Sequence, residues 1–447
     1  MTPKNRRICL LGASLETTNR GVSALSAATC RLFVDYLSPC EITLLVPARI
    51  SPRRRRVIGT NGLITVEVLG FCRGPVNGLR NSVVVALFAA ICYRVLPVRR
   101  VREFIVASIP LLRVIHQSDI VADLFAGDSF SDIYGFGRLC FRAVPCWCVA
   151  LLKKPYILLP QTYGPFKHRV SRKIAASIIS HATMAFTRTQ NDSTLSNLSI
   201  PTSKRLEYCP DVAFALVPSP AYGEMVRGGS NDSRPVVVGL NISALLYVGG
   251  YNRNNMFGLK MDYVGFADGL ISALLQFDHL HVVLIPHTYS VANLDDIEND
   301  LGACLKVAAK CSVDQGRLTV IRQALDQHQI KGAIGGCDFF IGSRLHSCIA
   351  ALSQHVVTVG VGYSKKFVET FSTVGMEDLV IDGRTTGNAE AIEKVIGFLS
   401  SRYSYQSRLK AGVERNQEII QQSFELIRQT IDTPTQVDGA CVPSYKG

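Results

Sequence analysis

The sequence has few charged residues, no paired cysteine motif and no long apolar run. Charged residues make up 19% and hydrophobic residues 47% of its 447 positions, a balance that excludes a chain disordered over most of its length. None of the 14 cysteines forms a CxxC pair, so we expect reduced, mostly buried thiols and no metal site. The longest apolar run, Val83–Tyr93, has eleven residues, whereas a helix needs about 20 to cross a bilayer.

Short motifs that mark common enzyme and nucleic-acid-binding classes are also missing. The sequence contains no complete glycine-rich dinucleotide fingerprint, no phosphate-binding loop and no serine-nucleophile elbow. It has no zinc finger or RNP box, so a nucleic-acid partner is not expected. The apolar run Ile8–Leu11 is too short for the core of a signal peptide, and we therefore expect a cytoplasmic protein.

Acidic residues are scarce between Arg49 and Arg113. This stretch holds twelve arginines, no lysine and only two acids, Glu67 and Glu103. Such a local excess favours an anionic membrane surface or an anionic substrate as partner over a merely solvated charged face. The apolar run Val83–Tyr93 inside it fits either a core helix or a helix lying in the membrane interface. Peripheral association with the inner face of the cytoplasmic membrane is therefore one hypothesis.

Short apolar runs alternate with helical stretches, a pattern typical of two α/β domains with mainly parallel sheets. Residues 219–235, rich in Pro, Gly and Ser, predict a linker between an N-terminal domain, 1–218, and a C-terminal domain, 236–400. Residues 401–432 predict a further helical segment, and 433–447 a flexible tail. Ligands bind at the carboxyl ends of parallel strands, so the cleft between the domains is the expected site.

The expected elements alternate through both halves. Strands are expected at Arg7–Leu11, Ile42–Val46, Ile64–Leu69, Ile120–Leu124, Tyr156–Pro160, Met184–Thr187, Leu206–Tyr208, Val236–Leu240, His281–Ile285, Leu318–Ile321, Asp338–Ile341, Val356–Val361 and Leu379–Ile381. Helices are expected near 21–37, 82–96, 102–117, 137–152, 169–181, 190–198, 263–276, 293–310, 388–400 and 405–431, with one beginning about Leu345.

Polar side chains that follow strands of the first half are candidates for binding an acceptor. Asn19 and Gly21 precede a helix, whose first N–H groups bind anions or polar groups. Asp128 and Asp132 are suited to bind sugar hydroxyls or to act as a base, and Gln161 offers both a donor and an acceptor. An ordinary turn is the alternative for the loop of Asn19, and turn or cap formation is the alternative for both aspartates.

The strongest constellation is Gly-Ser-Arg-Leu-His-Ser, which follows an apolar strand of the second half. Ser343 is predicted to cap the next helix, which places Arg344 and His346 in its first turn. A helix N-terminus favours a bound anion and lowers the pKa of a nearby histidine. We therefore predict that this loop binds an anionic donor.

Three further cationic or titratable side chains also follow strands. Arg188 is suited to a phosphate or carboxylate, with a structural ion pair as the alternative. His287 lies beyond the apolar part of its strand, and Lys365 lies in a loop that resembles only a fragment of a phosphate loop. Together these residues suit a transferase with an anionic donor and a hydroxylated acceptor.

These loops, in this order, resemble the polysaccharide pyruvyl transferase family. The pieces that carry the resemblance are residues 18–25 (TNRGVSAL), 126–135 (AGDSFSDIYG), 159–166 (LPQTYGPF), 187–193 (TRTQNDS), 209–216 (CPDVAFAL), 284–290 (LIPHTYS), 337–352 (CDFFIGSRLHSCIAAL) and 361–367 (VGYSKKF). The resemblance implies two Rossmann-like domains facing across a cleft, as in glycosyltransferase-B-like folds. It also implies transfer of pyruvate from phosphoenolpyruvate to two hydroxyls of a saccharide as a ketal, with Arg344, His346 and Arg188 serving the donor.

The expected partner is a saccharide acceptor, of which a lipid-linked saccharide is one form, in exopolysaccharide or cell-surface glycan synthesis. Phosphoenolpyruvate carries a phosphate and a carboxylate, so it needs at least two cationic contacts. No step of the transfer requires a metal or another cofactor. Two alternatives stay open, namely a nucleotide-sugar-dependent glycosyltransferase of the same architecture and a non-catalytic member of the family in polysaccharide assembly.

Overall fold

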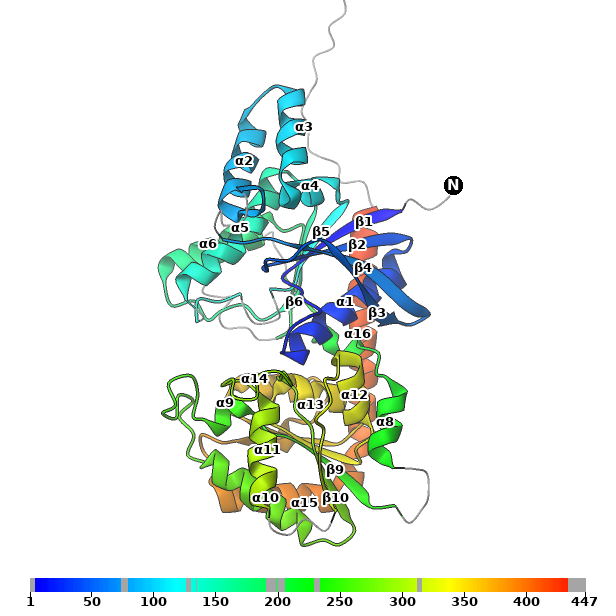
Figure 1. Cartoon of the computed structure of the whole chain (residues 1–447). Coiled ribbons are helices and arrows are strands. Elements are labelled where there is room, and N and C mark those ends of the chain that lie inside the picture. The colour runs from blue at the N-terminus through cyan, green and yellow to red at the C-terminus, as the bar shows by residue number, and fades with distance from the viewer. Residues whose placement is uncertain are drawn as a thin grey trace, which may run out of the picture.

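The chain forms two α/β halves stacked end to end, as the computed structural model shows (Figure 1). The structure describes residues 5–73, 79–125, 130–133, 135–189, 198, 206–228, 234–311 and 316–432. Each half is built on its own sheet, of eight strands in the first and six in the second. The predicted α/β class is therefore confirmed.

The first half is an eight-stranded sheet in the order β3-β4-β2-β1-β5-β6-β7-β8. Every neighbouring pair is parallel except β3 and β4. Its strands are β1 (Arg6–Leu11), β2 (Cys40–Val46), β3 (Arg53–Gly59), β4 (Gly62–Gly70), β5 (Ile120–Asp123), β6 (Tyr156–Gln161), β7 (Met184–Thr187) and β8 (Leu206–Tyr208). Its α-helices are α1 (Arg20–Leu37), α2 (Val83–Val95), α3 (Arg99–Ser108), α4 (Pro110–Gln117), α5 (Phe136–Leu151) and α6 (Arg169–His181).

The second half is a fully parallel sheet in the order β11-β10-β9-β12-β13-β14. Its strands are β9 (Val236–Asn241), β10 (Leu280–Leu284), β11 (Leu318–Val320), β12 (Phe339–Gly342), β13 (Thr358–Gly362) and β14 (Val380–Asp382). Its α-helices are α8 (Pro220–Arg227), α9 (Ala244–Tyr247), α10 (Tyr263–Leu275), α11 (Asp300–Lys310), α12 (Gln327–Gly335), α13 (Leu345–Leu352), α14 (Lys365–Ser372) and α15 (Asn388–Ser400). Short 3-10 turns complete the chain at Leu79–Asn81, Val212–Ala215 (η2), Glu377–Leu379 and Arg402–Tyr405.

Both sheets reverse their strand order at one point, between β1 and β5 in the first half and between β9 and β12 in the second. Loops that leave the carboxyl ends of strands on the two sides of such a reversal diverge and leave a crevice, which is where open α/β sheets bind ligands. The core strands around these points are buried, as parallel strands covered on both faces must be.

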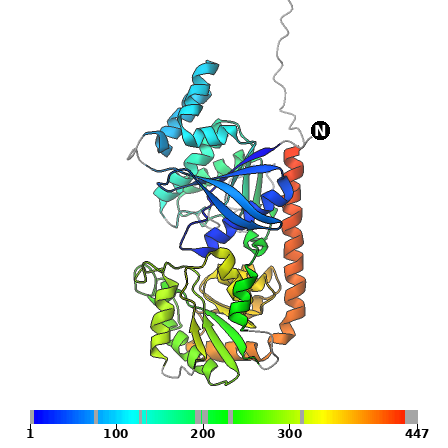
Figure 2. The same cartoon turned by 45° about the vertical axis from the view of Figure 1, so that its right-hand side comes forward.

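The last helix, α16 (Gln406–Asp432), runs alongside both halves (Figure 2). Phe424 near its end packs against Phe33 and Tyr36 of α1, with ring centroids 5.6 Å and 6.3 Å away. Asp432 accepts a hydrogen bond from Arg6 of β1. The helical segment at the C-terminal end therefore returns to the first half and fastens the two halves together.

Besides the short helices α9 and α14, which have no expected counterpart, the structure departs from the expected elements in four places. The strand β3 was not expected, because its arginine run lacks the apolar character of a strand. Pro110 divides the expected helix 102–117 into α3 and α4, since proline has no N–H to continue the helix. The helix expected over 293–310 begins only at Asp300, because Asn299 caps it.

The fourth departure concerns the expected linker 219–235, whose described part contains α8. Pro220 occupies the first turn and Gly228 ends the helix in the left-handed conformation, an arrangement that favours a helix over a loop. Helix α8 packs closely on α12, where a Cβ on Gly332 would lie 2.0 Å from the Ser219 carbonyl oxygen. The helix expected over 190–198 and the tail 433–447 lie outside the described residues, except for Leu198.

Candidate active site

A cavity of about 530 Å³ lies between the two halves, at the points where both sheets reverse their strand order. From the first half it is lined by residues that include Gly12, Asn19, Arg138 and Arg142, and from the second by Tyr251, Glu298, Arg344 and Tyr363. Three arginines and two glutamates, Glu16 and Glu298, therefore border one cavity, and the guanidinium groups are suited to bind an anionic ligand.

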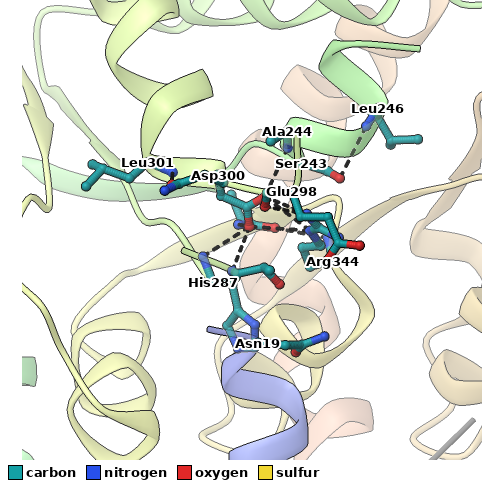
Figure 3. Close-up of polar contacts among 12 residues, drawn as sticks. Asn19, Ser243, Ala244, Leu246, His287, Glu298, Asp300, Leu301 and Arg344 are labelled. Atoms are coloured by element: carbon teal, nitrogen blue, oxygen red, sulfur yellow. Dashed lines mark hydrogen bonds and ion pairs between the residues drawn. The ribbon is translucent and has the colours of Figure 1, made fainter. Parts of the chain in front are cut away.

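The loop after β1 and the loop after β10 are joined directly across the two halves. Asn19 and Thr288 form an antiparallel bridge. The N–H of Arg20 donates to the His287 carbonyl over 3.1 Å, and the N–H of Tyr289 donates to the Thr18 carbonyl over 3.0 Å. The start of α1 is thereby fixed against the second half, which explains why Asn19 lies beside the segment of His287 in Figure 3.

The centre of the site in the second half is the buried carboxylate of Asp300 (Figure 3). It accepts backbone N–H groups of Ala244 and Thr288 at 2.9 Å and of His287 at 3.2 Å. It also binds the Arg344 guanidinium, with 2.8 Å between Arg344 Nη2 and Asp300 Oδ1. Because a fully buried carboxylate needs such donors, this network fixes the position of Arg344.

Arg344 is held by Asp300 but still reaches the cavity. Its side chain is 17% exposed, whereas that of Asp300 is 0% exposed. Its N–H donates to Asn241 Oδ1 over 3.0 Å, and its Nη2 donates to the Glu298 carbonyl over 3.1 Å. Burial opposes its charge, yet Asp300 raises the pKa of the guanidinium. Arg344 is thus a fixed, permanent cation on the wall of the cavity.

His287 is buried next to this pair and is uncharged. Burial lowers its pKa well below the ordinary value, and the facing groups His346, Arg344 and Arg20 lower it further. A neutral imidazole in this position is able to accept or donate a hydrogen bond but adds no charge.

A second buried arginine–aspartate pair lies in the first half and faces His346. Arg188 binds Asp211, and its Nη2 also donates to Thr162 Oγ1 over 3.0 Å. Asp211 Oδ1 accepts the N–H of Ala213 over 2.9 Å. Burial opposes the charge of Asp211, but Arg188 and His346 hold its pKa well below the ordinary value. Asp211 is therefore a stable carboxylate beside the histidine.

His346 stands between the two halves. Its Nε2 lies 3.6 Å from Asp211 Oδ2, and its side chain is 21% exposed. Nε2 has no hydrogen-bond partner among the described residues. The other side of the ring touches α1, where a Cβ on Gly21 would lie 2.5 Å from the His346 ring. A side chain at position 21 would clash with the His346 ring in this position, so glycine is required there.

Several predicted site residues lie together here, and the structure shows the contacts that hold them. Asn19 caps α1 by accepting the N–H of Gly21 and lines the cavity. Ser343 does not cap α13, since Arg344 is the residue before the helix, and Ser343 is buried behind it. Arg188 forms the structural ion pair that was the alternative, and it borders a different cavity of about 500 Å³.

Of the predicted residues, Asn19 and Arg344 line the cavity between the reversal points, whereas His287, His346 and the other predicted residues in the described structure do not. Asp132 accepts the N–H groups of Lys167 and His168, at 2.9 Å and 3.1 Å, so it stabilises a loop. Gln161 is buried, and its side chain has no hydrogen-bond partner among the described residues. Lys365 is exposed at the first residue of α14. Asp128 lies outside the described residues.

Four residues of the site were missed by the sequence analysis. Asp300 and Asp211 each pair with an arginine that was predicted, but they are 44 and 23 residues away from it in the chain. Arg138 and Arg142 come from α5, one turn apart on one face of a helix. The only local signal was for Asp211, which follows the strand Leu206–Tyr208 and lies in one of the pieces that resemble the family, residues 209–216.

The protein is similar to known proteins in both sequence and fold. The amylovoran biosynthesis protein AmsJ of Erwinia amylovora is 20% identical over 294 residues, which cover 65% of this chain and 68% of that protein. An α,α-trehalose-phosphate synthase (UDP-forming) from Burkholderia vietnamiensis matches with a TM-score of 0.54 at 12% identity, covering 97% of this chain and 98% of that one. A structure described as trehalose-6-phosphate from E. coli bound with UDP-2-fluoro glucose matches with a TM-score of 0.52 at 11% identity, covering 96% and 99%.

The similarity to these solved structures confirms the predicted glycosyltransferase-B-like fold of two Rossmann-like halves. A family model described as polysaccharide pyruvyl transferase matches residues 50–365, which is more than half of the chain. The chain therefore belongs to the polysaccharide pyruvyl transferase family and is a transferase.

Proposed function

We propose that the protein transfers the enolpyruvate-derived group of phosphoenolpyruvate to two hydroxyls of a saccharide, forming a pyruvate ketal in exopolysaccharide or cell-surface glycan synthesis. The observation that carries the proposal is the Arg344–Asp300 pair. Its cation is fixed by a buried carboxylate and borders a cavity that two further arginines share. Membership of the polysaccharide pyruvyl transferase family supports the reaction class.

The charge of the cavity suits the donor. Phosphoenolpyruvate carries a phosphate and a carboxylate, and each is suited to an arginine fork. Arg344 is one such fork, and Arg138 and Arg142 border the same cavity from α5. In this proposal Arg344 binds one anionic group of the donor and the α5 arginines bind the other.

His346 is the proposed proton donor to the methylene carbon of phosphoenolpyruvate, with Asp211 as its positioning residue. Asp211 Oδ2 lies 3.6 Å from Nε2 and is suited to orient the imidazole ring. Protonation of the methylene carbon makes the neighbouring carbon electrophilic, and a sugar hydroxyl bonds to it. The bond from that carbon to the phosphate oxygen then breaks, and a second hydroxyl closes the ketal. Of the two hydroxyl protons, one restores His346 and one leaves on the phosphate.

The acceptor is proposed to enter from the side of the first half, where Asn19 and the loop after β1 line the cavity. We take a lipid-linked saccharide at the inner face of the cytoplasmic membrane as the form of the acceptor. Related support comes from AmsJ, whose printed description assigns it to amylovoran biosynthesis.

The test is phosphate release from phosphoenolpyruvate in the presence of lipid-linked or free oligosaccharide acceptors, with mass spectrometry of the product. Acceptor-dependent release with a pyruvate ketal on the product is expected. His346→Gln and Arg344→Gln should each abolish it. His181→Gln and Arg408→Gln, at exposed positions on α6 and α16, are the matched controls and should leave it unchanged.

Two other outcomes would change the proposal. If no phosphate is released, and a nucleotide-sugar but not phosphoenolpyruvate raises the Tm of the protein, the glycosyltransferase alternative replaces this proposal. If release persists in both site variants, the pyruvyl transfer stands but the assigned site is wrong.

A further inference from the structure

The outer face of α2 is apolar and has no covering element in the described structure. Val84, Phe88, Ile91 and Val95 recur at intervals of three and four residues, so they lie on one face of the helix. Their side chains are between 45% and 73% exposed. Exposed apolar patches of this kind, rimmed by polar residues, mark binding surfaces.

The apolar face continues across the turn into α3. Leu96 and Val98 in the turn and Val101 and Phe104 in α3 are all exposed. Helices α2 and α3 pack against each other as a hairpin that projects from the first half, on the side away from the second (Figure 1, Figure 2). We call residues 83–104 the hairpin. No other part of the described chain covers its exposed apolar residues.

The hairpin is anchored rather than loose. Val83, Ala86 and Ala90 on the opposite face of α2 are buried and belong to the core that includes Val149 of α5. Arg102 lies over the Tyr93 ring, 4.4 Å from its centroid, and ties α3 to α2. The exposed face is therefore held outward by a packed inner face.

Arginines flank this face and carry an excess of positive charge. The hairpin holds Arg94, Arg99, Arg100 and Arg102 but one acid, Glu103, which pairs with Arg99. The arginines of β3 differ, because Arg53 and Arg55 bind Glu16 and Arg54 lies 3.7 Å from Glu67. The arginines of β3 are thus partly neutralised, whereas Glu103 is the only acid among the four arginines of the hairpin.

We propose that the hairpin docks the protein on the surface of a bilayer that contains anionic lipids. Apolar side chains at the level of the acyl boundary and arginines at the level of the phosphates are the two signals that together hold a protein on a membrane. A second copy of the chain is disfavoured as the occupant, because two hairpins face to face would bring their arginines together. No described helix has the length and apolar character to cross a bilayer, so the docking is interfacial.

This inference does not depend on the pyruvyl chemistry. It concerns a surface that is separate from the cavity between the halves, and a protein that binds membranes without transferring pyruvate would still satisfy it. If both proposals hold, the hairpin brings the cavity to the surface that presents a lipid-linked acceptor.

The test is co-sedimentation of the full chain with vesicles of phosphatidylcholine alone and of phosphatidylcholine with phosphatidylglycerol. Binding to the anionic vesicles is expected, and it should weaken as salt is added. The double variant Phe88→Asp/Phe104→Asp should abolish it. The triple variant Arg99→Gln/Arg100→Gln/Arg102→Gln should bind anionic vesicles about 100-fold more weakly.

Matched controls lie outside the hairpin. Leu63→Asp changes a similarly exposed apolar side chain of β4, and Arg54→Gln changes an exposed arginine of β3, so both should bind as the wild type does. Circular dichroism melting checks that each variant is folded.

Three results would overturn the proposal. They are no binding by the folded wild type, full binding by the folded Phe88→Asp/Phe104→Asp variant, and a dimer in solution that this variant dissociates. The last result would assign the face to a second copy of the chain.

Discussion

The site contains two buried arginine–aspartate pairs, and they differ in which member positions the other. In the second half, Asp300 is completely buried and Arg344 reaches the cavity, so the carboxylate positions the cation. In the first half, Arg188 is buried away from that cavity and Asp211 faces His346, so the arginine positions the carboxylate. The comparison shows that the role of an ion pair at a cleft depends on what each of its members faces. One pair is suited to bind an anion and the other to orient His346, the proposed proton donor.

The largest effect is expected from Asp300→Asn. The substitution leaves Arg344 without its buried partner and weakens the acceptor for the N–H groups of His287 and Thr288. We expect the free energy of unfolding to fall by about 3–5 kcal/mol, as measured by denaturant titration. Asp382→Asn, which breaks the exposed pair with Arg384, is the control and should cost at most about 1 kcal/mol. Equal losses in the two variants would show that Asp300 does not organise the site.

Arg344→Lys should impair the function more than the fold. Lysine keeps the charge but loses the fork that binds Asp300 through Nε and Nη2 and would bind the donor. A charged hydrogen bond is worth about 1.5–3 kcal/mol, so kcat/KM for phosphoenolpyruvate should fall about 10- to 100-fold. Steady-state kinetics with an acceptor measure this. Unchanged kinetics would remove Arg344 from the binding site and make its pair with Asp300 purely structural.

Gly21→Ala should reverse the usual sign of a helical glycine substitution. The new Cβ would lie 2.5 Å from the His346 ring, so the ring or α1 must move, at a cost of about 1–3 kcal/mol in stability. Gly397→Ala in α15 meets no atom within 4 Å and should instead stabilise the protein by about 0.5–1 kcal/mol. Thermal unfolding of both variants checks this. Stabilisation by both would mean that His346 is not held against α1.

The two pairs should also differ in their response to acid. His287, beside Arg344, has a lowered pKa, so below about pH 6.5 the unfolded chain binds a proton that the folded chain does not. Stability should therefore fall as the pH is lowered below about 6.5, by about 1.4 kcal/mol per pH unit from this group alone. His287→Gln should remove that slope. Asp211, with its depressed pKa, loses its contribution only when the pH falls below the ordinary aspartate value, so Asp211→Asn should keep the slope.

Denaturant titrations at several pH values between about 5 and 7 measure both slopes. A slope that is the same in the wild type and in His287→Gln would show that His287 is protonated in the folded protein. A slope lost in Asp211→Asn would mean that the acid response belongs to the first half.

The strands and their order along the chain were largely predictable, because buried parallel strands are short apolar runs bounded by polar loops. The strand β3 was not, since its arginine run lacks apolar character and the partner of Arg53 and Arg55 is Glu16, which is distant in sequence. The helix α8 was not predictable either, because a cluster of Pro and Gly indicates a loop, whereas here Pro220 stands at the start and Gly228 at the end of a helix.

The sequence predicted which loops form the candidate site, but it did not predict the role of each residue in them. The rule that ligands bind at strand ends led to Asn19, His287, Arg344 and His346, which lie together in the structure. It did not identify Asp300 as the partner of Arg344, because nothing local distinguishes a buried carboxylate at a helix start from an ordinary cap. For the same reason it did not decide between a ligand-binding role and an ion pair for Arg188.

The most direct test of the account is to measure phosphoenolpyruvate binding by calorimetry and turnover by phosphate release in Arg344→Gln and in Asp211→Asn. We expect Arg344→Gln to lose binding of phosphoenolpyruvate. We expect that folded Asp211→Asn still binds phosphoenolpyruvate but turns it over at least about 100-fold more slowly, because general acid catalysis contributes about that much. Full binding by Arg344→Gln, or normal turnover by Asp211→Asn, would contradict the division of roles between the two pairs.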